Sequence, residues 1–157
     1  MKLQKQLILD HNPEQGRHGD CYRTCIAILL GVDAADVPNF TGDAVEAGLG
    51  QDAADLAAQA WLTERGYRAI QMTVSAEFSG IGKWIEKAAA GMPYILAGQS
   101  PRYSSCHCVI ARGALEPVWC PSEGRPVMLE AWRDPASEAH FYFIEFIVRP
   151  VAAEAMP

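Results

Sequence analysis

The sequence predicts a single α+β domain, with helices concentrated in the first half of the chain and strands in the second. Two observations support this fold class. The chain has 157 residues, of which 50% are hydrophobic and 20% charged, as is typical of one globular domain with its own core. Capped and amphipathic segments precede residue 90, whereas β-rich segments between Gly, Pro and Asp turns follow residue 105. We expect residues 1–150 to form this domain and residues 151–157 to be a flexible tail.

The N-terminal region is predicted to lead into a helix. Residues 3–9 are expected to form a strand, and the polar loop that follows them is rich in turn-forming residues. Asp20 is expected to cap a helix over residues 21–30, because its carboxylate can accept hydrogen bonds from the free N–H groups at a helix start. Gly31 is expected to end this helix.

The later elements follow from hydrophobic spacing and turn residues. Asp33 is expected to cap a short turn over residues 34–37, and the glycine-containing region after it is expected to be a loop. Apolar residues at helical spacing predict a helix over residues 52–65, and a second helix is predicted over residues 82–90. Strands are predicted at residues 67–74, 93–97, 107–112, 127–132 and 141–148.

The composition excludes several classes of protein. The formal net charge is −6 and no run of basic residues is present, so we expect no nucleic-acid partner. No apolar segment approaches the length of a transmembrane helix, and the N-terminus lacks the apolar stretch of a secretory signal, so we expect no membrane partner. The five cysteines are an odd number, which fits reduced thiols in a cytoplasm better than a disulfide framework. We therefore expect a cytoplasmic protein.

Cys21 is the strongest candidate for a catalytic residue. It lies in the predicted first turn of a helix, where free N–H groups and the helix dipole stabilise an anion and lower the pKa of a thiol. The thiolate is the nucleophilic form of cysteine, so this position suits nucleophilic catalysis. A cysteine at a helix start is more often structural, however, so the catalytic interpretation depends on partner residues elsewhere.

Three residues are candidates for these partners. His107 lies at the predicted entry of a strand, at the rim of a sheet, where an imidazole can reach a nucleophile on a neighbouring helix as general base and acid. Asp134 follows another predicted strand, and its carboxylate could orient the His107 ring. The amide of Gln15 could join the Cys21 N–H in binding an oxyanion. The alternatives are a sheet-edge histidine, a turn aspartate and a solvated glutamine.

The residues around Cys21 carry a family resemblance. Gln15, the pair Asp20-Cys21 and Cys25 resemble the Gln-x4-Asp-Cys-x3-Cys/Ala motif of the C39 peptidases, papain-like domains that process bacteriocin leader peptides. No single one of these residues is specific, but all of them stand in the order and spacing of the motif.

The rest of the pattern extends the resemblance over most of the chain. His107 is followed by hydrophobic residues, and the pair Asp134-Pro135 follows a second predicted strand, as in that family. The segments 19–25 and 98–102 also resemble a set of small phage and prophage proteins of C39-like type. This resemblance implies a phage origin and, with it, a location in the host cytoplasm.

The resemblance implies a papain-like fold, in which an N-terminal helical half packs on a C-terminal antiparallel sheet. It also implies the roles of nucleophile for Cys21, base for His107, orienting carboxylate for Asp134 and oxyanion donor for Gln15. The implied activity is hydrolysis of a peptide or isopeptide bond in a peptide or protein substrate, through a Cys-His-Asp triad and a thioester, without a cofactor. That family usually has Gly after the nucleophile. Here Tyr22 stands there, and its bulk is expected to narrow the cleft or alter its specificity.

Other functions remain open at this stage. The same triad supports a deamidase or an acyltransferase, and a silent papain-like binding module could sequester a host protein. Cys106, His107, Cys108 and Cys120 could also suggest a zinc site. On a regular strand Cys106 and Cys108 point to one face and His107 to the other, so we expect no bound metal. The oligomeric state is not indicated by the sequence.

Overall fold

One antiparallel sheet organises the chain. The computed structural model describes residues 1–9, 11–12, 17–100, 102 and 105–150, so the predicted tail, 151–157, lies outside the described residues. The order of strands in the sheet is β1-β6-β2-β3-β4, and β5 pairs with β6 off this path. The strands are β1 (Arg68–Ser75), β2 (Tyr94–Gln99), β3 (Cys106–Arg112), β4 (Glu116–Trp119), β5 (Trp132–Arg133) and β6 (His140–Val148). The helices are α1 (Cys21–Leu30), α2 (Phe40–Glu46), α3 (Gln51–Glu64), α4 (Ile81–Ala89) and the short 3-10 helix η2 (Ala34–Asp36).

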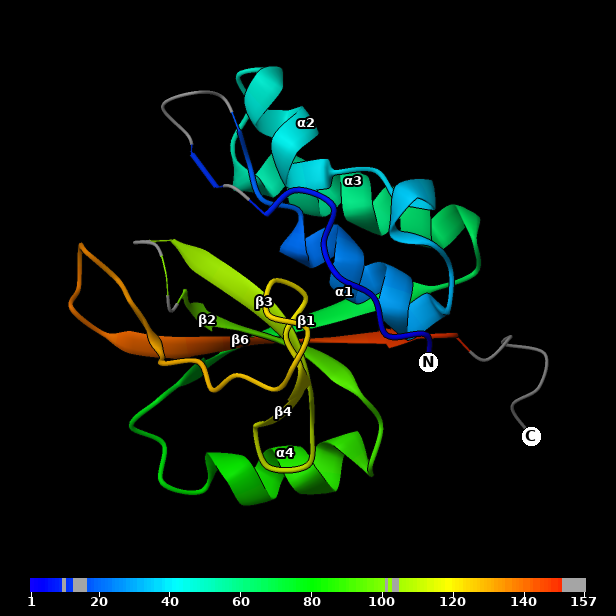
Figure 1. The fold of residues 1–157 in the computed structure, drawn as a ribbon. Coiled ribbons are helices and arrows are strands. Elements are labelled where there is room, and N and C mark those ends of the chain that lie inside the picture. Colours follow the sequence, from blue (N-terminus) through cyan, green and yellow to red (C-terminus); the bar gives the residue numbers. More distant parts are fainter. Residues whose placement is uncertain (10, 13–16, 101, 103–104, 151–157) are drawn as a thin grey trace.

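Helices cover both faces of the sheet. Figure 1 shows α1, α2 and α3 together on one face and α4 alone on the other. Two core clusters result: Ile26 and Leu62 pack with Ile110 on the first face, and Ile85 packs with Val109 on the second. The covered central strand β2 is accordingly buried along nearly its whole length. The chain is therefore a mixed α+β protein, as the sequence predicts, with one helix on the face opposite the other three.

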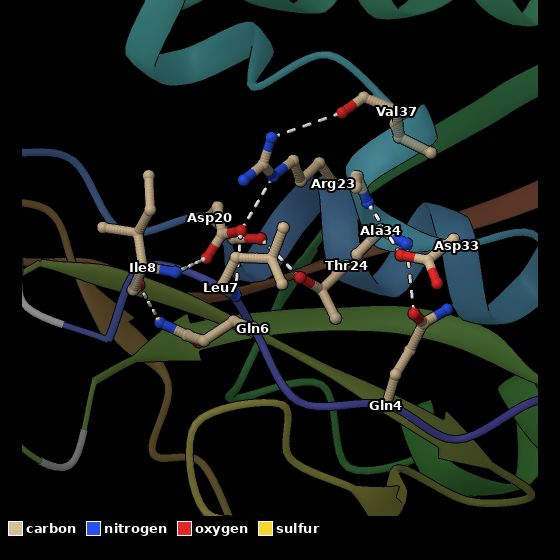
Figure 2. A network of polar contacts seen from close by, with 11 residues as sticks. Gln4, Gln6, Leu7, Ile8, Asp20, Arg23, Thr24, Asp33, Ala34 and Val37 are labelled. Carbon is tan, nitrogen blue, oxygen red and sulfur yellow. Dashed lines mark hydrogen bonds and ion pairs between the residues drawn. The ribbon is translucent and has the colours of Figure 1, made fainter.

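The N-terminal segment is held by side chains and not by a strand ladder. Helix α1 has the predicted bounds, and Gly31 ends it in the left-handed conformation at φ 74°. Asp20 is the residue at the N-cap position, as predicted, but its side chain makes no capping hydrogen bond. The Asp20 carboxylate instead accepts hydrogen bonds from the N–H groups of Leu7 (3.1 Å) and Ile8 (2.8 Å), as Figure 2 shows. These bonds hold the N-terminal segment, and the strand that was expected over residues 3–9 is not formed.

An ion pair completes this network at the start of α1. The Arg23 Nε donates to the Asp20 carboxylate at 2.7 Å, and the Asp20 side chain is fully buried. The Gln4 side chain accepts from Ala34 N–H at 3.0 Å and so joins the same segment to η2. Asp33 caps η2 through the Ala35 N–H, as predicted. Asp20, the residue before Cys21, is therefore held by hydrogen bonds from Leu7, Ile8 and Arg23.

Three other features of the fold differ from the elements predicted from the sequence. Helix α2 occupies the expected glycine-containing loop, because Phe40 and Ala44 are buried against the first core cluster. Strand β4 was not expected. The predicted strand 127–132 is reduced to one bridge between Glu130 and Gln99 and to the two residues of β5. In the described part of the chain, no helix is long and apolar enough to cross a membrane.

Candidate active site

A cavity of about 560 Å³ lies over the end of α1 and the sheet. Its wall combines two residues from α1 with residues from β3 and β6, which are far apart in sequence. It is lined by, among others, Cys21, Tyr22, His107, Cys108, Phe143 and Glu145. About 560 Å³ is within the usual size range of ligand sites. The candidate nucleophile and base from the sequence therefore line one cavity.

Cys21 is the first residue of α1 and is half-buried at the cavity wall. Its pKa is lowered well below its ordinary value: hydrogen bonding with the Cys108 thiol has the largest effect, burial opposes it, and the His107 imidazole lowers the pKa further by hydrogen bonding and by its charge. The N–H groups of the first helical turn have no intrahelical acceptor and add to the stabilisation of a thiolate. The pKa of the Cys108 thiol is raised, because it is hydrogen-bonded to Cys21 and buried.

His107 lies in the second position of β3 and is 8% exposed. Its Nε2 lies 3.2 Å from Cys120 Sγ and 3.4 Å from Ser122 Oγ. With Nε2 engaged there, Nδ1 is the ring nitrogen left for Cys21. Burial lowers the pKa of His107, but hydrogen bonds with Cys120 and Cys21, and the negative charge of both sulfurs, overcome this effect and raise it to about 10. The ring is therefore held between two thiols as an imidazolium.

The structure does not bring Asp134 to His107. The Asp134 carboxylate accepts hydrogen bonds from the Ala136 N–H at 3.1 Å and from the Ser137 hydroxyl at 2.5 Å, both within its own turn. Among the described residues, the side chains hydrogen-bonded to the His107 Nε2 are Cys120 and Ser122. The Asp134 carboxylate, which was expected to orient the imidazole, is therefore hydrogen-bonded within its own turn. The predicted oxyanion donor, Gln15, lies outside the described residues.

Two sets of contacts in the site were not predicted from the sequence, although Cys120 was considered as a metal ligand and Tyr22 as a residue that shapes the cleft. Cys120 and Ser122 belong to the segment after β4, and no local pattern links them to a histidine on β3. Glu145 and Tyr22 form the other pair: the Tyr22 hydroxyl lies 3.0 Å from both carboxylate oxygens of Glu145. Glu145 did carry a signal, since it is the only charged side chain among the apolar residues 141–148.

The cysteines near His107 do not converge on a metal site. Cys108 packs toward the first core cluster, whereas Cys120, bonded to His107, belongs to the second. In the parts of the chain that the structure covers, no group of three or more His, Cys, Asp or Glu side chains could hold a metal ion.

Comparisons of this chain with protein-family models, with curated proteins and with solved structures found no match.

Proposed function

We propose that this protein is a papain-like cysteine hydrolase that cleaves a peptide or isopeptide bond with Cys21 as its nucleophile. The observation that carries the proposal is the position of Cys21 at the start of α1, on the wall of a cavity that His107 of β3 also lines. A thiol with a lowered pKa beside an imidazole, on a cavity wall, is the arrangement that nucleophilic cysteine catalysis requires.

The architecture supports the papain-like part of the proposal. The nucleophile is carried by a helix of the N-terminal half, and the base by an antiparallel sheet onto which that helix packs. The chain order, Cys21 before His107, is that of the family that the sequence resembles. In this proposal Cys120 and Ser122 orient the imidazole, a role that was expected of Asp134.

The first half of the reaction forms a thioester. The Cys21 thiolate attacks the carbonyl carbon of the substrate, a carbon–sulfur bond forms, and the carbonyl oxygen becomes an oxyanion. Free N–H groups at the start of α1 stabilise this oxyanion, and Gln15 remains the predicted second donor. The His107 imidazolium then gives its proton to the leaving amine as the carbon–nitrogen bond breaks.

The second half releases the acid and regenerates the enzyme. Neutral His107 takes a proton from a water molecule, whose oxygen attacks the thioester carbonyl. The carbon–sulfur bond breaks, Cys21 leaves as a thiolate, and His107 is again an imidazolium. An amine in place of water at this step would give acyl transfer, and a side-chain amide as substrate would give deamidation.

The test is the rate of alkylation of each cysteine by iodoacetamide as a function of pH, read by peptide mass spectrometry. Cys21 is expected to react well below the ordinary thiol pKa of about 8.5, because His107 and Cys108 stabilise its thiolate. The reactive ion pair exists above the pKa of Cys21 and below that of His107, which is about 10. Cys106 is the internal reference, since it is more exposed than Cys21 and its pKa is raised.

Two variants complete this test. His107→Ala is expected to move the alkylation profile of Cys21 to higher pH, whereas His140→Ala, at an exposed histidine, is expected to leave it unchanged. Thermal melts of both variants check that they remain folded. If Cys21 of the wild-type protein reacts like a free thiol, or more slowly than Cys106, the hydrolase proposal is wrong and a binding module becomes the better explanation.

A further inference from the structure

A buried carboxylate on the cavity wall has no cationic partner in the part of the chain that the structure describes. Glu145 of β6 is 5% exposed and lines the cavity. Its partner is the Tyr22 hydroxyl, which lies 3.0 Å from both carboxylate oxygens and has one proton to share between them. Within the described residues no Lys, Arg or His side chain forms an ion pair with Glu145. Buried carboxylates are rare unless they are paired, so this one calls for a partner from outside the chain.

We propose that Glu145 is a specificity-determining residue that binds the cationic side chain of a lysine or arginine in the substrate. The inference rests on the proposed function, because it assigns the substrate class of the Cys21 cavity. A basic side chain entering the cavity would supply both the positive charge and the N–H donors that Glu145 lacks.

The sheet places Glu145 on the same face as the Cys21 side of the site. In the strand register Glu145 aligns with Ile95, which aligns with Ile110 of β3. Cys108, the partner of Cys21, is two residues from Ile110 and therefore points to the same face. Two strand spacings and two residues separate Glu145 from Cys108, which is roughly 12 Å along the sheet. The Glu145 side chain extends over part of that distance, and a lysine or arginine side chain of a residue close to the bond at the Cys21 sulfur can cover the remainder.

The charges around the cavity also favour a cation at this end. Burial raises the pKa of Glu145 to about 7, and the negative charge of Asp55 adds to this effect by repulsion. Asp55 of α3 lines the same cavity, and its carboxylate accepts a hydrogen bond from Gln51 at 2.8 Å. Arg102, a basic residue of the cavity wall, is already paired with Glu123. The region near Glu145 is therefore acidic. The positive charge of Arg102 is paired with Glu123 and not with Glu145.

Tyr22 connects specificity to catalysis. It directly follows Cys21 on α1, and its hydroxyl donates to Glu145 across 123 residues of sequence. The bond fixes the carboxylate relative to the nucleophile. A bulky residue at this position, unusual for the family that the sequence resembles, thus shapes the pocket for the basic side chain.

The experiment measures labelling of Cys21 by peptidyl acyloxymethyl ketones, in which the thiolate displaces the carboxylate leaving group. The probes are acetylated tripeptides of alanine with one lysine, norleucine or glutamate, placed in turn at each of the three positions. The second-order labelling rate is read at Cys21 by mass spectrometry. For the wild-type protein, the lysine probe at one position is expected to react at least about tenfold faster than its norleucine counterpart, and the glutamate probe slowest.

Three variants identify the residue responsible. Glu145→Gln is expected to abolish the preference for lysine over norleucine, while labelling by the norleucine probe persists. Tyr22→Phe keeps the carboxylate and is expected to retain most of the preference. Glu46→Gln, at an exposed residue of α2, is the matched control and should not change it.

The outcomes separate the two proposals. Labelling of Cys21 without a lysine preference in the wild-type protein overturns this inference and leaves the hydrolase proposal standing. A preference that survives Glu145→Gln overturns the role of Glu145. If no probe labels Cys21 in the folded protein, the hydrolase proposal fails and this inference fails with it.

Discussion

Replacing Asp20 by asparagine should destabilise the protein by about 3–5 kcal/mol. The Asp20 side chain is fully buried, and three donors point at its two oxygens: Leu7 N–H at 3.1 Å, Ile8 N–H at 2.8 Å and Arg23 Nε at 2.7 Å. Asparagine has the same shape but one oxygen, and its amide group is a donor. Its oxygen can therefore accept hydrogen bonds at only one of the two oxygen positions. At the other position its N–H group faces another hydrogen-bond donor.

The magnitude follows from what is lost. Hydrogen bonds to charged groups contribute about 1.5–3 kcal/mol each, and asparagine removes the ion pair with Arg23 together with at least one bond to a backbone N–H. The Arg23 side chain is only 14% exposed, so its charge is left with little water to replace the lost partner. Breaking a buried ion pair on one side typically costs about 3–5 kcal/mol.

Urea unfolding followed by circular dichroism measures this effect. The control is Asp36→Asn, at an exposed residue of η2, which should change the free energy of unfolding by less than about 0.5 kcal/mol. A loss below about 1 kcal/mol for Asp20→Asn would refute the reasoning, since it would mean that the N-terminal segment is not held by this carboxylate. Because Asp20 precedes Cys21, the variant should also slow alkylation of Cys21 in the folded protein.

Three further predictions concern His107 and the strands around it. A Cβ at Gly98 would clash with the Glu130 carbonyl oxygen, so Gly98→Ala should cost about 1–3 kcal/mol in urea unfolding, and Gly50→Ala, where nothing lies within 4 Å, should cost less. Cys120→Ala removes a partner of His107 Nε2 and should shift alkylation of Cys21 to higher pH, because the pKa of His107 falls. Asp134→Asn should leave that profile unchanged; an equal shift would show that Asp134 acts on His107 after all.

Local patterns were enough to predict the elements that carry the two principal site residues. Asp20 and Gly31 delimit helix α1, and Cys21 is its first residue, so the position of the thiol at a helix start follows from the sequence. The apolar residues after His107 predict β3 within one residue of its observed start. Such signals depend on residues within a few positions of one another, which is the range of caps, turns and periodicity.

The partners of these residues depend on contacts across the chain. The Asp20 carboxylate could accept hydrogen bonds from the first N–H groups of α1, but it accepts them from the N–H groups of Leu7 and Ile8 instead. Asp134 follows a predicted strand, yet its carboxylate accepts a hydrogen bond from the hydroxyl of Ser137, three residues later. Both residues illustrate that a local pattern identifies a hydrogen-bonding group without deciding which group it binds.

Strand register decided the rest of the site. His107 lies next to Cys120 because β4, which precedes Cys120, pairs with β3, and Tyr22 reaches Glu145 because α1 packs on the sheet that contains β6. The sequence by itself determined the α+β class and the two elements that carry a thiol and an imidazole. Only the tertiary structure decided what orients the imidazole and what lines the opposite wall, because those contacts join segments up to 123 residues apart, beyond the range of any local signal.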